Sequence, residues 1–259
     1  MNTYELIKKL NDITHIDIQE EWDNSGPQLS FSKEIKKVMV TLDVNETVVN
    51  EAVENDVDMI ISHHPLIFTP LKHLNDENVY DAFILKLIDN KISVYASHTN
   101  FDQIEGGNND FLGKLFGLTD VTLLSEEESF SRKGKLDEPI AVEDFANRIA
   151  DNLGLNPASI RIAKSKEDAK VQNIAWCSGD GTGFLFNAVK AGMDCFVTGD
   201  VKYHQSAFAT EFGLNIIDIG HYGSEYCFIE NMVAMLENLS DKDFDVIKVN
   251  SLKDPFTYI

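Results

Sequence analysis

The sequence lacks the two features that would direct it to a membrane or out of the cell. It has no run of eighteen consecutive apolar residues, the length that a membrane-spanning helix requires. Its first residues, MNTYELIKKLNDI, have the spacing of an amphipathic helix, without the apolar block and small-residue cleavage site of a signal peptide. These absences predict a cytoplasmic protein with no membrane partner.

Cysteine and positive charge are also scarce. Cys177, Cys195 and Cys227 show no CxxC spacing, and two of them lie in apolar runs, which favours buried, reduced thiols over metal ligands. The chain has 22 Lys and Arg against 43 Asp and Glu, a formal net charge of −21 at pH 7, and no visible basic cluster. Because such a surface repels phosphate backbones, binding to nucleic acid is disfavoured.

Apolar runs and helical patterns alternate along the chain. This alternation is typical of βαβ units with a mainly parallel sheet, and 259 residues provide for one large domain or two smaller ones. The fold class predicted is therefore α/β. Strands are expected at 37–42, 58–62, 92–97, 172–177, 194–198 and 214–219, and helices near 46–55, 78–90, 183–192, 202–212 and 223–238, with a final strand near 245–250.

An internal repeat divides the chain. Residues 38–64 align without gaps on residues 174–200, at a constant offset of 136. We therefore expect two similar three-layer α/β domains related by duplication. A metal-binding domain is expected over 1–124 with 218–259, and a second domain over 125–217, because the charged segment 125–140 breaks the pattern. The identical pairs include Ala52 and Ala188, Val53 and Val189, and Asp58 and Asp194.

Histidines follow three of the predicted strands. His63 and His64 come after DMIIS, His98 after ISVYAS, and His221 after LNIIDIG. In open α/β sheets, ligands bind beyond the carboxyl ends of the strands, where side chains from separate strands converge. If the two adjacent imidazoles had only a structural role, each buried ring would need its own hydrogen-bond partners. Metal binding is therefore the favoured interpretation.

Carboxylates accompany these histidines. Asp102 lies four residues after His98, and Glu225 lies four residues after His221 in what reads as the first turn of a helix. Imidazole mixed with carboxylate suits Zn, Fe or Mn better than Ca or Mg, which prefer oxygen ligands throughout. His98 fits three roles equally: it can bind metal, orient a ligand or transfer a proton.

Three further segments have less specific patterns. CSGDGTG, residues 177–183, is either an anion-binding loop or a tight turn. TGDVKYH, residues 198–204, occupies the repeat position of the histidine pair, so Asp200, Lys202 and His204 are candidates for substrate contacts. EEWDNSGPQ, residues 20–28, is either a turn or a pocket lining.

These motifs, with SHHPLIF, SHTNFD and GHYGSE, occur in an order that resembles the GTP cyclohydrolase I type 2 homologue family, also called NIF-three-like proteins. The resemblance covers about residues 20–225. It implies a ring-like homohexamer with two metal ions per subunit. It places the metal ligands at His63, His64, Asp102, His221 and Glu225, with Glu225 bridging. Pro27 departs from the family pattern, as does CSGDGTG, where a more glycine-rich loop is usual.

Two divalent ions on such ligands predict a hydrolase that activates water, and the family name implies a nucleotide substrate such as GTP, attacked at C8 of the purine. His98 is the candidate catalytic proton shuttle, and Lys202 or the CSGDG amides are candidate triphosphate contacts. Two alternatives stay open at this point. One is a metal-dependent phosphoesterase or nucleotidase, and the other is a non-catalytic metal-binding scaffold.

Overall fold

The structure is a computed structural model that describes residues 1–258. Within this range the chain forms two compact units. The first unit consists of Met1–Ile104 and Phe228–Lys253, and the second consists of Glu105–Cys227 and the residues from Asp254 onward. The first unit is therefore discontinuous in sequence, with the second unit inserted into it.

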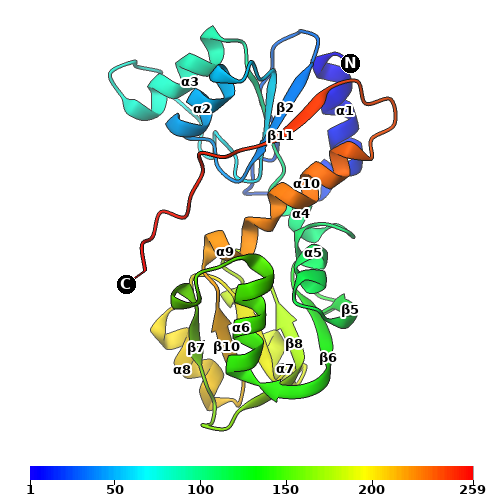
Figure 1. Ribbon diagram of the computed structural model, residues 1–259, viewed down its shortest axis with the longest axis vertical. Helices are drawn as coiled ribbons and strands as arrows, with labels where there is room; N and C mark the ends of the chain where they lie inside the picture. Colours follow the sequence, from blue (N-terminus) through cyan, green and yellow to red (C-terminus); the bar gives the residue numbers. More distant parts are fainter. Residues whose placement is uncertain (259) are drawn as a thin grey trace. The chain divides into compact units, whose positions relative to one another are not determined.

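The first unit has a sheet with helices on both faces. Its elements are α1 (Thr3–Ile13), η1 (Ile16–Ile18), β1 (Gly26–Leu29), β2 (Lys37–Thr41), α2 (Glu46–Glu54), β3 (Met59–Ser62), α3 (Val79–Asp89), β4 (Ser93–Ala96), α4 (Thr99–Gln103), α10 (Cys227–Glu237) and β11 (Asp245–Lys248). The strand order over the described residues is β1-β4-β3-β2-β11, with only β1 antiparallel to its neighbour. In Figure 1, α2 and α3 lie on one side of this sheet, and α1 and α10 lie on the other.

The central strands are buried throughout because helices cover both faces of the sheet. Every residue of β3 and β4 is buried, as expected for parallel strands inside an α/β sheet. The amino-terminal helix α1 has a capping box, in which Asn2 accepts from the backbone of Glu5 at 3.0 Å and the Glu5 carboxylate accepts from the Asn2 amide at 2.9 Å.

The second unit has a larger mixed sheet. Its elements are α5 (Asn108–Leu115), β5 (Thr119–Leu123), β6 (Arg132–Ala141), α6 (Val142–Leu153), η2 (Pro157–Ser159), β7 (Arg161–Ala163), β8 (Lys170–Trp176), η3 (Thr182–Phe184), α7 (Leu185–Lys190), β9 (Cys195–Thr198), α8 (Tyr203–Glu211), β10 (Asn215–Asp218) and α9 (His221–Glu225). The strand order is β5-β6-β8-β9-β10-β7, in which β8, β9 and β10 are parallel.

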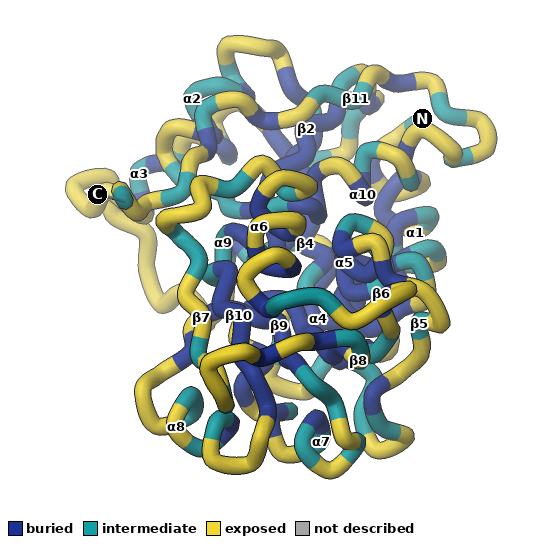
Figure 2. The backbone as a smooth tube through the Cα atoms, turned by 60° about the horizontal axis from the view of Figure 1, so that its bottom comes forward, coloured by how far each residue is buried: buried dark blue, intermediate teal, exposed yellow. Residues whose placement is uncertain are grey.

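Alternating residues of these parallel strands face two separate cores. Trp176 and Val197 pack with α5 and α6, whereas Ala175 and Phe196 pack with α7 and α8. The period of two is the strand repeat, so helices cover both faces of this sheet too. Figure 2 shows β9 and β10 as buried and the outer side of α6 as exposed. The α/β fold class is confirmed, with a sheet between helices in each unit.

All the predicted strands and helices are confirmed to within a few residues, but the sequence pattern did not predict several others, among them the strands β1, β5, β6 and β7 and the helices α4, α5 and α6. Helix α6 has a clear pattern in retrospect, since Val142, Phe145, Ala146, Ile149 and Ala150 are buried at helical spacing. It ends at Gly154, whose φ of 65° is the left-handed conformation favoured after a helix.

The repeat appears in the structure as equivalent hydrogen bonds. One carboxylate oxygen of Asp58 accepts from the backbone amides of Lys36 and Lys37 at 2.7 and 3.0 Å. The equivalent oxygen of Asp194 accepts from the amides 136 residues further on, Gln172 and Asn173, at 3.0 and 2.7 Å. Strands β3 and β9 also coincide at this offset. These paired contacts support the duplication.

The boundaries between the units differ from those expected at 124/125 and 217/218. They fall at 104/105 and 227/228 because β5 pairs with β6 of the second sheet, and because Phe116 and Cys227 pack in the second unit's core. The segment 125–140, expected as the junction, contains most of β6. His221 and Glu225 therefore belong to the second unit.

Two smaller expectations from composition can be compared with the structure. Among the described residues, no helix is long and apolar enough to cross a membrane. The thiols of Cys177, Cys195 and Cys227 are all buried. Burial raises the pKa of the Cys195 thiol, so this group stays protonated near neutral pH.

Candidate metal centre

The histidine pair lies at the carboxyl end of β3, where the backbone ladder continues past the strand. The amide of His63 donates to the Thr41 carbonyl at 3.2 Å, and the amide of His64 donates to the Leu42 carbonyl at 3.0 Å. The His63 side chain is fully buried and that of His64 is partly exposed. Their ring centroids are 5.2 Å apart. The sheet therefore fixes both imidazoles at one edge.

Each imidazole is oriented by an acceptor on Nδ1. Nδ1 of His63 lies 2.8 Å from the carbonyl oxygen of Ser97, and Nδ1 of His64 lies 2.7 Å from a carboxylate oxygen of Asp43. A carbonyl or an ionised carboxylate can only accept, so Nδ1 carries the proton. Nε2 is then left with the lone pair that a metal ion needs.

His98 joins the pair from the end of β4. The ligand nitrogens of His63, His64 and His98 lie within 4.8 Å of one another, so they can hold a metal ion. Asp102, four residues after His98 on α4, is buried, and its carboxylate lies 3.6 Å from Nε2 of His63. The first unit therefore brings together all four of its predicted site residues.

A buried carboxylate, that of Asp23, holds His98 in place. The Asp23 side chain is 0 % exposed, and one of its oxygens lies 2.8 Å from Nδ1 of His98. Burial alone would raise the pKa of Asp23, but hydrogen bonds from His98 and Thr99, the charge of His98 and a hydrogen bond from Ser25 hold that pKa well below its usual range. Asp23 is therefore ionised and fixes the ring orientation of His98.

Sequence reasoning did not assign roles to Asp23, Asp43 or Ser97. Asp23 lies in EEWDNSGPQ, where the residue pattern by itself indicates only a turn or a pocket lining. Asp43 had a usable signal, because it follows the predicted strand KVMVTL and so lies at the same sheet edge as the histidine pair. The Ser97 contact uses a backbone carbonyl, which no side-chain pattern reveals.

The second unit contains a matching imidazole and carboxylate. His221 and Glu225 begin and end α9, and Nε2 of His221 lies 3.0 Å from a carboxylate oxygen of Glu225. Nδ1 of His221 lies 2.9 Å from a carboxylate oxygen of Asp200. Asp200 was expected to contact substrate, but the structure places it on His221. It orients this ring as Asp43 orients His64.

The CSGDGTG loop packs closely against α9, and there is no room for a side chain at Gly179. A Cβ on Gly179 would lie 2.5 Å from an oxygen of Glu225, and Gly179 has a φ of 61°. The Gly179 amide donates to the Ser224 hydroxyl at 2.9 Å, and the Gly181 amide donates to Thr198 at 2.8 Å. These amides are engaged within the unit. The loop is therefore a tight turn that lies directly against the Glu225 carboxylate.

Lys202 and His204 lie at the exposed start of α8. The Lys202 amide donates to the side chain of Gln205 at 2.7 Å, and the His204 ring packs edge-on against Tyr203. Of the three residues predicted from TGDVKYH, only Asp200 thus contacts a candidate ligand. The two others are open to solvent on the following helix.

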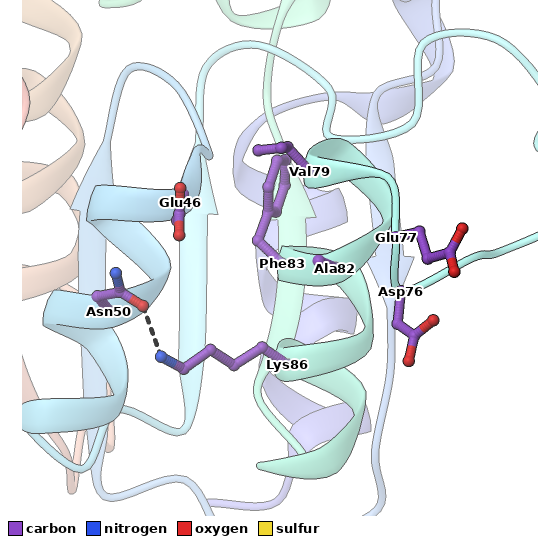
Figure 3. A pocket seen from close by; sticks show the side chains of 8 residues that line it. All are labelled: Glu46, Asn50, Asp76, Glu77, Val79, Ala82, Phe83 and Lys86. Atoms are coloured by element: carbon purple, nitrogen blue, oxygen red, sulfur yellow. Dashed lines mark hydrogen bonds between the residues drawn. The ribbon is translucent and has the colours of Figure 1, made fainter.

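A separate groove of about 230 Å³ lies between α2 and α3 (Figure 3). Its lining combines carboxylates with the Lys86 ammonium, which lies 2.5 Å from the Asn50 side-chain oxygen. The lining residues are Glu46, Asn50, Asp76, Glu77, Val79, Ala82, Phe83 and Lys86. Because none of these is a histidine, the groove offers a poorer donor set than the edge of the sheet.

The donor chemistry of each unit, taken by itself, fits a divalent metal ion. In the first unit, Nδ1 of His63, His64 and His98 each contacts an oxygen acceptor, and the Asp102 carboxylate is buried. In the second unit, Nδ1 of His221 contacts a carboxylate oxygen, and the Glu225 carboxylate is buried. Mixed nitrogen and oxygen donors suit Zn, Fe or Mn. The fold and these residues define an α/β protein with a candidate divalent-metal site.

The Duf34/NIF3 (NGG1p interacting factor 3) family model matches residues 1–255, and the chain belongs to this family. A Clostridium perfringens relative named GTP cyclohydrolase 1 type 2 homolog is 32 % identical over 265 residues and spans all of both chains. A Campylobacter jejuni relative of the same name is 36 % identical over 262 residues, again spanning both chains. The family expected from the motifs is thus confirmed.

A solved structure agrees with the fold. A Staphylococcus aureus protein superimposes with a TM-score of 0.92 at 31 % identity, covering 100 % of this chain and 99 % of that one. The match extends over both units, so the two-sheet architecture is that of the family.

Proposed function

We propose that this protein is a metal-dependent hydrolase with two divalent ions per chain and a nucleotide substrate such as GTP. The proposed ligands are His63, His64 and Asp102 from the first unit and His221 and Glu225 from the second. The observation that supports it most is the common orientation of the imidazoles: in each ring Nδ1 contacts an oxygen acceptor, so Nε2 is the nitrogen that the ring can offer to a metal ion. Zn, Fe and Mn all suit this donor set.

Divalent ions at these residues would acidify a water molecule and polarise the bond that it attacks. His98 supplies the proton transfer, because Asp23 holds its Nδ1 and leaves Nε2 to accept a proton. Glu225 is proposed as the bridging carboxylate, whose negative charge offsets repulsion between the two cations. Gly179 leaves room for this carboxylate.

The substrate class is proposed from the relatives, whose names include GTP cyclohydrolase 1 type 2 homolog. For GTP, the attack would fall at C8 of the purine. Lys202, exposed at the start of α8, is the proposed contact for the triphosphate, and the neighbouring exposed His204 is a proposed substrate contact. The net charge of −21 opposes binding of a polyanion, and bound cations would reverse this sign locally.

The test is incubation of the metal-loaded protein with a panel of nucleotides, followed by chromatography of the products. A ring-opened or pterin-like product from GTP supports the proposal. Free phosphate would instead indicate a phosphoesterase or nucleotidase, and no product with any nucleotide would indicate a non-catalytic metal-binding scaffold.

A matched pair of variants shows whether the activity belongs to this site. His63→Gln should abolish turnover and lower the metal content measured by elemental analysis. His73→Gln is the control, because His73 is exposed in the segment between β3 and α3. Equal turnover in the two variants would show that the histidine pair is not the centre.

We also propose that the chain assembles with itself, as a homohexamer, on the basis of the family resemblance. Light scattering at micromolar concentration tests this directly. A stable monomer would contradict it and would leave the proposed metal ligands unaffected.

A further inference from the structure

Two large aromatic side chains of the first unit lie exposed beside His98. Trp22 is 60 % exposed and Phe68 is 50 % exposed. Their ring centroids are 6.1 Å apart, and they lie 6.0 and 6.4 Å from that of His98. The three rings therefore form one cluster, with an imidazole of the candidate metal centre at its inner end and two open rings at its outer end.

Hydrogen bonds hold the two loops that bear these rings together. The Asn24 side-chain amide donates to the Ile67 carbonyl at 2.6 Å, and the Ile67 amide donates to the Gln28 side-chain oxygen at 3.0 Å. The Gln28 amide group in turn donates to the Asn24 carbonyl at 2.6 Å. These three contacts join the two loops next to the aromatic rings. Ile67 immediately precedes Phe68, and Asn24 lies two residues after Trp22.

Trp22 also has a rigid neighbour, because the next residue is the buried Asp23 that binds His98 and Thr99. The backbone beneath the indole is therefore anchored while the ring remains open to solvent. Exposed tryptophan surface is unfavourable in water, and side-by-side exposed aromatic rings commonly mark a binding surface. The loop contacts hold the rings where a ligand at the histidines would meet them.

We infer that Trp22 and Phe68 form the stacking platform for a planar heteroaromatic ring of the substrate, of the nucleobase class. This inference rests on the proposed function, because it identifies the part of a nucleotide that the first unit recognises. Aromatic side chains bind nucleobases through their π faces and need no specific hydrogen bonds.

The geometry favours a flat ring as the occupant. The planes of the Trp22 and Phe68 rings meet at 48°, so a ligand ring can stack on the indole while its edge meets the Phe68 ring. The His98 ring stands at 79° to the indole, with its centroid 6.0 Å away. A nucleobase stacked on Trp22 would therefore lie next to His98, the proposed proton carrier.

The direct test is titration of the full-length protein with GMP, followed by tryptophan fluorescence and calorimetry. The chain has two tryptophans, and Trp176 is fully buried, so quenching on binding reports on Trp22. We expect Trp22→Ala to weaken GMP binding by about 5- to 150-fold, the range measured for loss of one stacked base. Phe68→Ala should weaken it in the same direction, and Trp22→Phe should retain most of the affinity.

Controls separate stacking from other effects. Tyr4→Ala removes a similarly exposed ring, 56 % exposed on α1, and should leave GMP binding unchanged. Inorganic tripolyphosphate, which has no base, should bind Trp22→Ala as it binds the wild type, and the metal content should also be equal. An unchanged GMP affinity in Trp22→Ala, or an equal loss of tripolyphosphate binding, would refute the platform.

Two outcomes distinguish this inference from the proposed function. A protein that binds GMP through Trp22 but hydrolyses no nucleotide supports the platform and contradicts the hydrolase. A protein that hydrolyses GTP but whose Trp22→Ala variant binds GMP normally contradicts the platform alone. If Trp22→Ala changes only the oligomeric mass in light scattering, the rings are a contact between copies of the chain and the platform is refuted.

Discussion

Replacing Asp23 with asparagine tests whether His98 is held by a buried charge. The carboxylate accepts from Nδ1 of His98, the Asn24 amide, the Ser25 hydroxyl, and both the amide and the hydroxyl of Thr99. An asparagine keeps one oxygen and replaces the other with an NH₂ group, which is a donor. Whichever oxygen is replaced, at least one group that donated a hydrogen bond to it then faces the NH₂ group, which is also a donor.

The magnitude follows from the burial of this network. A hydrogen bond to a charged group contributes about 1.5–3 kcal/mol, and its loss is not compensated by water where the side chain is 0 % exposed. We therefore expect Asp23→Asn to lower the unfolding free energy of the first unit by about 2–3 kcal/mol. If the new NH₂ group faces His98, the ring must carry its proton on Nε2, so turnover falls as well.

Asp43→Asn is the matched control. Asp43 makes the same type of contact, to Nδ1 of His64, but its side chain is 45 % exposed, so water can replace the lost interaction. We expect a loss of about 0.5 kcal/mol or less, as at ordinary surface positions. Urea unfolding of the metal-free proteins, followed by circular dichroism, provides the comparison.

The pH dependence supplies a second measurement. Because the pKa of Asp23 is lowered on folding, its stabilisation is present above the unfolded-state pKa, near 4, and is lost as the pH falls below that value. Asp23→Asn should lack this part of the acid loss. Equal stability of Asp23→Asn and the wild type at pH 7, or identical acid profiles, would refute the buried-charge account of His98.

Three further predictions concern other parts of the chain. Glu225→Gln should fold but bind at most one ion per chain after dialysis, whereas His98→Gln should keep both ions and lose mainly turnover; elemental analysis showing two ions in Glu225→Gln would exclude the bridging role. Gly179→Ala should destabilise the second unit by about 1–2 kcal/mol, because φ is positive, and should lower the metal content by displacing Glu225. Gly183→Ala, where a Cβ meets nothing within 4 Å, should do neither, and equal effects at the two glycines would contradict the close-approach argument. Partial burial would raise the pKa of Asp58, but Lys33 and two backbone amides lower this pKa overall. The wild type should therefore lose stability as the pH falls below about 4. Asp58→Asn should lose less over this range, as measured by urea unfolding.

The sequence by itself determined the parts of this protein that depend on local order. The largely apolar runs at 59–62 and 195–198 form strands that are buried because helices cover both faces of the sheet. Such a run predicts a buried strand without any information on its neighbours in space. The histidines were found because a side chain just after a parallel strand must lie at the carboxyl edge of the sheet. The repeat was readable because duplication conserves the residue spacing, as the equivalent amide contacts of Asp58 and Asp194 show.

Only the tertiary structure decided which groups orient the site. Asp23 is 75 residues from His98 in sequence and Asp200 is 21 residues from His221, so no local spacing connects either pair. The unit boundaries also depended on strand pairing. Strand β5 belongs to the second unit because it pairs with β6, and this pairing is not visible in the sequence of either strand. The aromatic pair Trp22 and Phe68 lies on separate loops, and side chain to backbone hydrogen bonds bring them together. Such contacts join residues that are far apart in the sequence, so they can be identified only once the tertiary structure shows which segments lie next to one another.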